Sequence, residues 1–361
     1  WPGAEGLVIP LPEPHRALID AAIARALERL SRRAAPLGDG AQHLTAAISA
    51  AASDGKRMRP ALVVASFAAF GGDIAGAGDR SALWDVAAAF ELLHTAFLVH
   101  DDLIDRDVER RGVPNIAGRF RERARELGAD GRGTAVVSDA ASVVAGDLLL
   151  YEATRLIASA AVTEPQRDEL FAVLDEAVLV SAVGELADAE HAARAECPDA
   201  VALLTTAHDK TAVYSFRAPL RAGAVLAGTL ADDALAAAAA DLGLAFQLVD
   251  DLIGTFGSRQ QAGRDPGADL RASKRTPLIA LARESPAWPR VSSALAVAHT
   301  GPIAVRRAQK EIEASGARAE LEEQVRYRLR RARAQATAPE VPRGAVVLLA
   351  SLADAIERRI P

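Results

Sequence analysis

Apolar residues recur at helical spacing along most of this chain, and clusters of glycine, proline and aspartate interrupt the pattern. Each uninterrupted stretch is long enough for several helical turns. The pattern predicts helices at residues 14–34, 41–52, 59–70, 80–105, 137–160, 165–195, 199–228, 230–255 and 275–285, with a smaller set after residue 300.

Two long connections separate some of these helices, and each follows an acidic sequence at a predicted helix end. Residues 106–138 are rich in arginine, glutamate and glycine and contain Pro114, so we expect a connection that carries one short exposed helix. Residues 259–273 form the second connection. No linker divides the chain, and we expect one domain at residues 13–361 after a flexible lead-in at residues 1–12.

Composition narrows the fold class to all-α. Half of the residues are hydrophobic but only 4% are aromatic, and the frequent alanines favour packed helices over a sheet. The single cysteine, Cys197, excludes an intrachain disulfide and fits a reducing cytoplasm. A net charge of -6 argues against a general nucleic-acid binder, although a local cationic pocket is compatible with it.

The sequence also predicts no membrane span. A spanning helix needs an apolar run of about 18 residues or more. Asp232 and Asp233 interrupt the alanine-rich stretch, and Asp354 interrupts the C-terminal one.

The first acidic motif, HDDLID, closes a predicted apolar helix. Asp101 and Asp105 are one helical turn apart and share a face, with Asp102 beside them. Negative charge at a helix C-terminus opposes the helix dipole, so a solvated helix end is the less favoured alternative. Magnesium takes one or two carboxylates and completes its shell with water and phosphate oxygens, which this motif could support.

The second acidic motif, QLVDDLIG, closes another long apolar helix. Gln247 and Asp251 share a face, and Asp250 precedes Asp251. Alone, this pair could equally cap or pair locally. Two acidic helix ends, each followed by a connection with basic residues, predict two walls of a cavity that holds metal and diphosphate.

Basic residues accompany both motifs. Arginine offers phosphate a planar fork of donors and lysine a point charge, although an isolated basic pair is usually solvated surface. The candidates are Lys56 and Arg59 in GKRMRP, Arg110 and Arg111 after the first motif, Lys210 with Thr211, and Arg264, Asp269 and Lys274 after the second motif.

Other polar residues carry less weight. His94 lies on an apolar stretch where a hydrogen-bonded core histidine is the common case, and His100 is left unassigned. Two acidic pairs are interpreted as ordinary surface: Asp188 with Glu190, and Glu322 with Glu323.

The chain from Gly55 to Lys274 resembles the trans-isoprenyl diphosphate synthase family, which includes farnesyl and geranylgeranyl diphosphate synthases. The resemblance rests on GKRMRP, ELLHTAFLVHDDLID, ERRGVP, DKT, FQLVDD and GADLRASKRT, in that order. It implies an all-α single-domain bundle of the isoprenoid synthase type with a central cavity. It also implies a magnesium-dependent prenyltransferase, with three ions per site when substrate is bound, and a homodimer.

The resemblance also implies roles for individual residues. The magnesium ligands would be Asp101, Asp102, Asp105, Asp250 and Asp251. The isopentenyl diphosphate site would comprise Lys56, Arg59, His94 and Arg111. The allylic diphosphate would be held by Arg110, Lys210 and Lys274, with Arg264 in the following loop and with Thr211 and Gln247 near its first carbon.

Three departures from the family pattern stand out. Gly254 occupies the position of a frequent final aspartate in the second motif, which could weaken one metal contact. Asn115, Ile116 and Ala117 replace a usual threonine and histidine, and Arg264 replaces a usual lysine.

Product length should depend on side chains about one turn before the first motif. Phe97 is bulky, whereas Ala96 is small. We expect a fifteen- or twenty-carbon product, with twenty favoured because Ala96 leaves room, and we expect Ala96→Phe to shorten it.

Two alternatives remain open at this stage. A terpene cyclase also ionises a prenyl diphosphate but needs only one diphosphate site, so Lys56, Arg59 and Arg111 argue against it. An inactive regulatory subunit of a prenyl synthase is the other alternative, and Gly254 is the residue that favours it.

Overall fold

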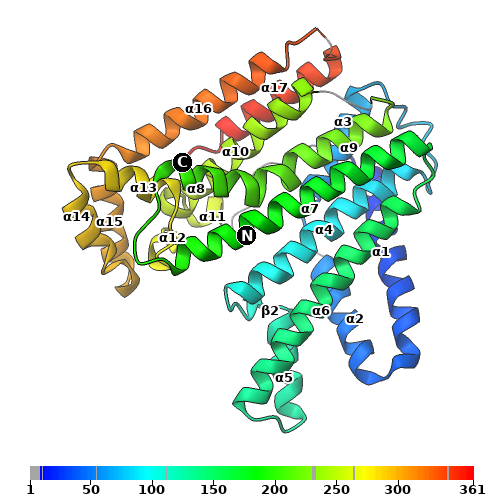
Figure 1. The fold of residues 1–361 in the computed structure, drawn as a ribbon, viewed down its shortest axis with the longest axis horizontal. Coiled ribbons are helices and arrows are strands. Elements are labelled where there is room, and N and C mark those ends of the chain that lie inside the picture. Colours follow the sequence, from blue (N-terminus) through cyan, green and yellow to red (C-terminus); the bar gives the residue numbers. More distant parts are fainter. Residues whose placement is uncertain are drawn as a thin grey trace. The chain divides into compact units, whose positions relative to one another are not determined.

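The computed structural model describes residues 9, 11–53, 55–110, 112–229, 233–262, 265–339 and 341–361. These residues are almost entirely helical and include one two-stranded sheet, which confirms the all-α prediction (Figure 1). They form two compact units. The N-terminal unit comprises Ile9–Leu174 with Ala222–Leu230, and the C-terminal unit comprises Asp175–Arg221 with Ala231–Pro361.

The N-terminal unit is a helical bundle. It contains α1 (Glu13–Ala34), η1 (Ala35–Leu37), α2 (Asp39–Ser53), α3 (Met58–Ala69), α4 (Ala82–Ile104), β1 (Glu109–Arg110), β2 (Val113–Pro114), α5 (Ile116–Glu126), α6 (Gly131–Ala158), the start of α7 (Glu164–Ala193) and the end of α9 (Ala218–Leu226).

Helix α4 lies at the centre of this unit and ends in the first acidic motif. Ser81 caps its start by accepting a hydrogen bond from the backbone N–H of Leu83 at 3.3 Å. Trp84, Phe90 and Leu93 are fully buried, and α4 packs against α1, α3 and α6. A helix that is apolar on most sides is expected at the core of a bundle.

The connection after α4 is more ordered than the sequence suggested. Residues 106–138 contain the β1–β2 hairpin, α5 and the first turns of α6. Helix α5 is amphipathic rather than exposed, because Ile116, Phe120 and Ala124 are buried. Helix α6 begins at Gly131, six residues before the predicted start at residue 137, because Asp130 caps it by accepting from the Gly133 N–H at 2.7 Å.

The C-terminal unit contains the remaining helices. They are the rest of α7, α8 (Ala200–Ala207), the π-helical segment η2 (His208–Arg217), the start of α9, α10 (Asp233–Phe256), α11 (Arg259–Ala262), α12 (Ala268–Arg271), α13 (Pro277–Glu284), α14 (Trp288–Leu295), η3 (Ala298–Thr300), α15 (Pro302–Ala314), α16 (Ala317–Gln335) and α17 (Arg343–Glu357).

Helix α10 is the core helix of this unit and carries the second acidic motif. It packs against η2, α16 and α17. The structure corrects two predictions here. The predicted helix at residues 199–228 is divided into α8, η2 and α9, and the connection at residues 259–273 contains the short helices α11 and α12.

Parts of the domain prediction remain predictions. Residues 1–8 and 10 of the expected lead-in lie outside the described residues, and α1 begins at Glu13. The single domain and its central cavity also stay predictions.

Two helices in the described part of the chain are long and apolar enough to cross a membrane by length and composition alone. The apolar window of α4 is 72% buried inside its own unit, which is typical of a core helix, whereas that of α6 is 39% buried. The expected absence of a membrane span, the cytoplasmic location and the absence of nucleic-acid partners therefore stay predictions.

Candidate active site

The first acidic motif places two buried carboxylates at the end of α4. Asp101 is 9% exposed and Asp102 is 6% exposed, while Asp105 is the exposed C-cap residue. Burial raises the pKa of Asp102, and the Arg110 guanidinium opposes that shift. Arg110 Nη2 donates to Asp102 Oδ1 at 2.6 Å and lies 3.7 Å from Asp101 Oδ2.

The β1–β2 hairpin positions Arg110 beside these aspartates. Arg110 pairs with Val113 across the hairpin, and Gly112 adopts a φ of 75°, which favours glycine. Asn115 fastens the hairpin to α5: its Nδ2 donates to the Asp107 carbonyl at 2.9 Å, and its Oδ1 accepts from the Gly118 N–H at 2.9 Å. Asn115, which departs from the family pattern, therefore has a structural role at the start of α5.

The residues that follow Asn115 pack inward. Ile116 and Ala117 are buried in the first turn of α5. Arg111, predicted to bind isopentenyl diphosphate, lies outside the described residues.

The GKRMRP loop is held by its middle arginine. Arg57 is 3% exposed and donates to Asp20 Oδ1 at 2.7 Å and to Glu91 Oε1 at 2.9 Å. Its backbone adopts a φ of 55°. Burial lowers the pKa of Arg57, but the negative charges of Glu91 and Asp20, which accept its hydrogen bonds, raise that pKa overall. Arg57 thereby joins α1 and α4 to the start of α3, and it leaves the flanking basic residues as the candidate anion donors.

The three described candidates for the isopentenyl diphosphate site belong to the N-terminal unit. Lys56 is exposed before α3, Arg59 is 8% exposed in the first turn of α3, and His94 is half-buried on α4. Helices α3 and α4 pack against each other. The local fold therefore brings the elements that carry these residues together.

The two product-length candidates differ in their surroundings. Phe97 is half-buried and lies one turn before Asp101 on the same face of α4. Ala96 is 0% exposed and points to another side of the helix. A phenylalanine at position 96 would overpack the core, so the expected Ala96→Phe test would report stability as well as product length.

The second acidic motif, on α10, is also buried. Asp251 is 9% exposed, and Gln247 Nε2 donates to Asp251 Oδ1 at 2.9 Å. Burial raises the pKa of Asp251 well above its ordinary value, and the charges of Asp269 and Asp250 act in the same direction. Lys274, exposed after α12, opposes the shift.

Asp250 is paired with an arginine from the end of the chain. Arg359 is 7% exposed, and its Nη2 donates to Asp250 Oδ1. Its guanidinium also lies 4.6 Å from the ring centroid of Phe246. Burial raises the pKa of Asp250, and Arg359 opposes that shift.

Two predicted substrate-contact residues present buried oxygens without partners. Gln247 Oε1 and Thr211 Oγ1 have no hydrogen-bond partner among the described residues, and Thr211 is 1% exposed. Buried polar atoms are normally satisfied. Gln247 lies against Asp251, and carboxylate and amide oxygens are ligands that magnesium and its bound waters prefer.

Each acidic motif by itself offers fewer carboxylates than a complete magnesium shell requires, so water and phosphate oxygens would complete that shell. No group of three His, Cys, Asp or Glu side chains within the described ranges could hold a metal by itself. Each motif offers a close pair of aspartates, and magnesium typically takes one or two carboxylates.

Lys210 is held by α7. Its Nζ donates to Glu185 Oε1 at 3.0 Å and to Asp188 Oδ2 at 2.7 Å. Gly184 permits this contact, since a Cβ at that position would lie 2.3 Å from the Lys210 backbone nitrogen. Asp188, interpreted from the sequence as ordinary surface, is 44% exposed in its side chain and pairs with Lys210, which lies in the π-helical segment η2.

The two remaining departures from the family pattern are Gly254 and Arg264. Gly254 is buried on α10, so an aspartate there would add another buried charge. Arg264 lies outside the described residues.

Sequence reasoning missed Arg359 and Gly184 as parts of these sites, and it named Asp269 without giving it a role. A glycine in the middle of the 30-residue helix α7 was a usable indication of a close approach. Asp269 stood within a quoted motif, but nothing in the local sequence placed Arg359 beside Asp250.

Comparison with known proteins agrees with these features. A family model described as polyprenyl synthetase matches residues 41–310. The geranylgeranyl diphosphate synthase of Sulfolobus acidocaldarius is 29% identical over 231 residues, which cover 63% of this chain and 62% of that protein. The (2E,6E)-farnesyl diphosphate synthase of Mycobacterium bovis is 34% identical over 227 residues, which cover 62% of this chain and 55% of that protein.

Both alignments span less than two thirds of those relatives. A crystal structure of geranylgeranyl pyrophosphate synthase from Corynebacterium glutamicum, complexed with isoprenyl diphosphate and magnesium, is 26% identical. It matches with a TM-score of 0.84 and covers 95% of this chain and 98% of that chain. Because the family model covers most of the sequence and includes both acidic motifs, this chain belongs to the polyprenyl synthetase family.

Proposed function

We propose that this chain is a short-chain trans-prenyltransferase. It joins isopentenyl diphosphate to dimethylallyl, geranyl or farnesyl diphosphate and forms a fifteen- or twenty-carbon prenyl diphosphate. The observation that carries this proposal is the pair of buried acidic helix ends, each held by an arginine: Arg110 on Asp102 and Arg359 on Asp250. Such sites combine metal ligands with donors for phosphate oxygens.

The cofactor of the proposed reaction is magnesium, held by Asp101, Asp102, Asp105, Asp250 and Asp251. When bound, magnesium neutralises the charge that develops on the departing diphosphate of the allylic substrate. The resemblance implies three magnesium ions per site, which would bind one diphosphate.

The chain's own residues do the remaining work. Arg110, Lys210 and Lys274 donate to the allylic diphosphate and stabilise it as it leaves. Lys56, Arg59, His94 and Arg111 hold isopentenyl diphosphate.

The apolar sides of α4 and α10 exclude water from the allylic cation, which water would convert to an alcohol. The alkene of isopentenyl diphosphate then attacks the cation. The sequence offers no dedicated base, and the released diphosphate takes the proton.

The proposed product has fifteen or twenty carbons, and the preference for twenty (geranylgeranyl diphosphate), which rested on the small size of Ala96, gains no support from the position of that residue. Phe97 shares a face with Asp101 and is half-buried, so it is the better candidate for the floor of the tail site. Ala96 is packed inside the N-terminal unit and leaves less room than its size suggested.

The decisive experiment is an assay of the purified protein with magnesium, isopentenyl diphosphate and each allylic diphosphate in turn. We expect longer prenyl diphosphates, identified by mass spectrometry, and strongly reduced but measurable product with Asp101→Asn. Products that form without isopentenyl diphosphate would indicate a terpene cyclase. The absence of any product would favour the inactive regulatory subunit.

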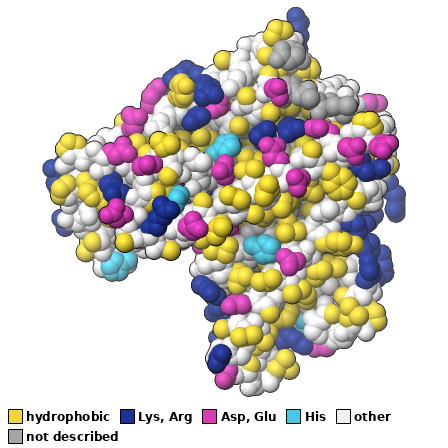
Figure 2. Space-filling view, viewed as in Figure 1, with side chains coloured by type: hydrophobic (Ala, Val, Ile, Leu, Met, Phe, Trp, Pro, Cys, Tyr) yellow, Lys and Arg dark blue, Asp and Glu magenta, His cyan; other side chains and the backbone are white. Residues whose placement is uncertain are grey.

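We also propose a homodimer, as the resemblance implies. An apolar stripe on α6 supports it: Val136, Val143, Val144 and Tyr151 recur at helical spacing and are 44–60% exposed. In the view of Figure 2, hydrophobic side chains lie along the face that α6 presents. Light scattering should give a dimer mass, and Val144→Glu should give a monomer, whereas a monomeric parent would exclude the dimer.

A further inference from the structure

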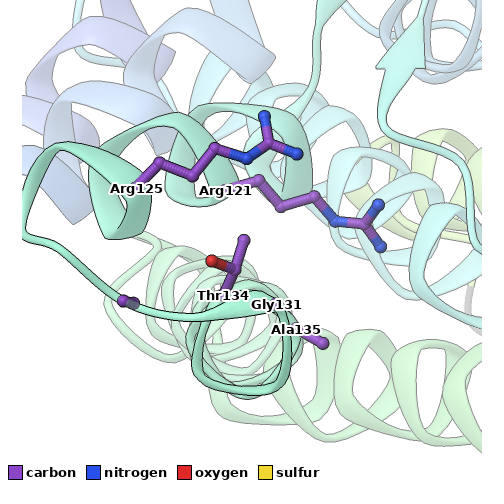
Figure 3. A pocket seen from close by; sticks show the side chains of 6 residues that line it. Arg121, Arg125, Gly131, Thr134 and Ala135 are labelled. Carbon is purple, nitrogen blue, oxygen red and sulfur yellow. The ribbon is translucent and has the colours of Figure 1, made fainter.

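A separate cavity lies in the N-terminal unit where α5 ends and α6 begins. It encloses about 400 Å³ and is lined by Arg121, Arg125, Ala129, Gly131, Thr134 and Ala135 (Figure 3). The hairpin that carries Arg110 joins the opposite end of α5. The cavity is lined by residues from the second half of α5 to the start of α6, and none of them belongs to the first acidic motif or to its hairpin.

Two arginines form one side of this cavity. Arg121 and Arg125 lie one turn apart on the same face of α5, where like charges repel. Arg121 Nε donates to Ser138 Oγ at 3.4 Å, and Arg125 makes no ion pair with any described residue. Figure 3 shows both side chains extending along the same side of the cavity.

The neighbouring acidic residues do not neutralise these arginines. Asp130 caps α6 through the Gly133 N–H, and Glu122 and Glu126 are exposed on α5. Among the described residues, none of the three forms an ion pair with Arg121 or Arg125. Arg132 adds a further positive charge at the start of α6.

Thr134 forms the other side of the cavity. It is 5% exposed, and its hydroxyl makes no hydrogen bond to a described residue although its side chain lines the cavity. The side chain is largely buried and its hydroxyl has no partner among the described residues, so it can bind a ligand independently of the arginines.

The start of α6 adds backbone donors to this side. The first N–H groups of a helix have no partner inside it, and the helix dipole favours an anion there. Gly131 leaves space, because a Cβ at that position would meet no atom within 4 Å.

We propose that this cavity binds the phosphoryl group of a small molecule. Two guanidinium groups, a threonine hydroxyl and a helix N-terminus are donors that match the several oxygens of a phosphate or diphosphate. The cavity is open to solvent, since Arg125, Gly131 and Ala135 are exposed, and its volume lies in the range of small-molecule sites, so a phosphate or a diphosphate fits. The site is independent of the proposed prenyl transfer.

Isothermal titration of the full chain with inorganic phosphate and with diphosphate, in EDTA, tests this proposal. EDTA separates the measurement from magnesium-dependent binding at the acidic motifs. Hydrogen exchange should show protection at residues 121–135. The tighter of the two anions identifies whether the site accepts one phosphoryl group or two.

Matched variants localise the binding. Arg125→Gln and Thr134→Val should each weaken binding, Arg125→Gln by about tenfold, as expected for loss of a charge-assisted hydrogen bond. Arg119→Gln, on the same helix but outside the cavity, should leave it unchanged. The proposal is overturned if neither anion binds, if protection appears elsewhere, or if Arg125→Gln binds as tightly as the parent.

Discussion

Among the proposed metal ligands Asp102, Asp250 and Asp251, Asp251 is the one whose pKa is raised furthest above its ordinary value. Burial raises its pKa well above the ordinary value, and Asp269 and Asp250 add to the shift. Below about pH 4 the folded and unfolded chains both hold this proton. As the pH rises further, the unfolded chain loses this proton first, so Asp251 progressively lowers the stability of the folded chain. Above the folded pKa of Asp251, the loss of stability stays constant.

Asp251→Asn should therefore raise the melting temperature of the magnesium-free protein at pH 7 and leave it nearly unchanged near pH 4. The amide keeps an oxygen that can accept from Gln247 Nε2. Prenyl transfer should be lost, because a metal ligand is removed. Calorimetry at both pH values measures the difference, and equal stabilisation at both would contradict the electrostatic explanation.

The Arg359–Asp250 contact makes a second prediction at this scale. Arg359→Gln should lower the free energy of unfolding by about 3–5 kcal/mol, because a largely buried carboxylate loses its partner. Adding Asp250→Asn should recover part of that loss. Urea denaturation measures both changes, with exposed Arg358→Gln as the control; an equal loss in the control would remove the special role of Arg359.

Phe97 is the residue on which product length should depend. Phe97→Ala should lengthen the product, since it removes a ring one turn before Asp101 on the same face. Chromatography of the products measures this, and Phe70→Ala, at the half-buried C-cap of α3, is the matched control. An unchanged product distribution would show that the floor lies elsewhere.

At the scale of elements, helix ends and close helix contacts organise the candidate site. Most predicted helix boundaries agree with the structure within a few residues, because capping residues and helical periodicity are local. Two predictions differ more: α6 begins six residues before its predicted start, at its local cap Asp130, and the predicted helix at residues 199–228 is divided. Helix α8 continues into the π-helical η2, which the periodicity of residues 199–228 does not reveal.

The Gly184 contact gives the prediction for this scale. Gly184→Ala should lower the free energy of unfolding by about 1–3 kcal/mol, because its Cβ would force α7 away from the Lys210 backbone. It should also lower kcat/KM through displacement of Lys210. Gly40→Ala on α2, where a Cβ meets nothing within 4 Å, is the control and should leave both unchanged or slightly stabilise the fold.

At the scale of the whole molecule, the two acidic motifs belong to different units of the chain. The proposed reaction requires both to act on one diphosphate. If they do, Asp101→Asn and Asp250→Asn should be non-additive in kcat/KM, with a coupling energy above about 0.5 kcal/mol. Exposed Asp79→Asn, paired with Asp101→Asn, should be additive; additivity of Asp101→Asn with Asp250→Asn would contradict a shared diphosphate.

The sequence by itself determined the all-α class, the principal helices and the acidic and basic motifs. Helical periodicity, composition and carboxylate spacing are properties of neighbouring residues, so they can be recognised without coordinates. The resemblance then supplied roles for these residues, including those at Arg111 and Arg264.

Tertiary structure alone decided which charges are paired. Arg359 is 109 positions from Asp250, Arg57 is 37 positions from Asp20, and Lys210 is 22 positions from Asp188. Such contacts depend on how helices distant in sequence pack, and packing is a property of the assembled core rather than of any local pattern. For the same reason, the cavity beside Arg121 and Arg125 could not be predicted from the sequence, because it forms only where α5 and the start of α6 pack together.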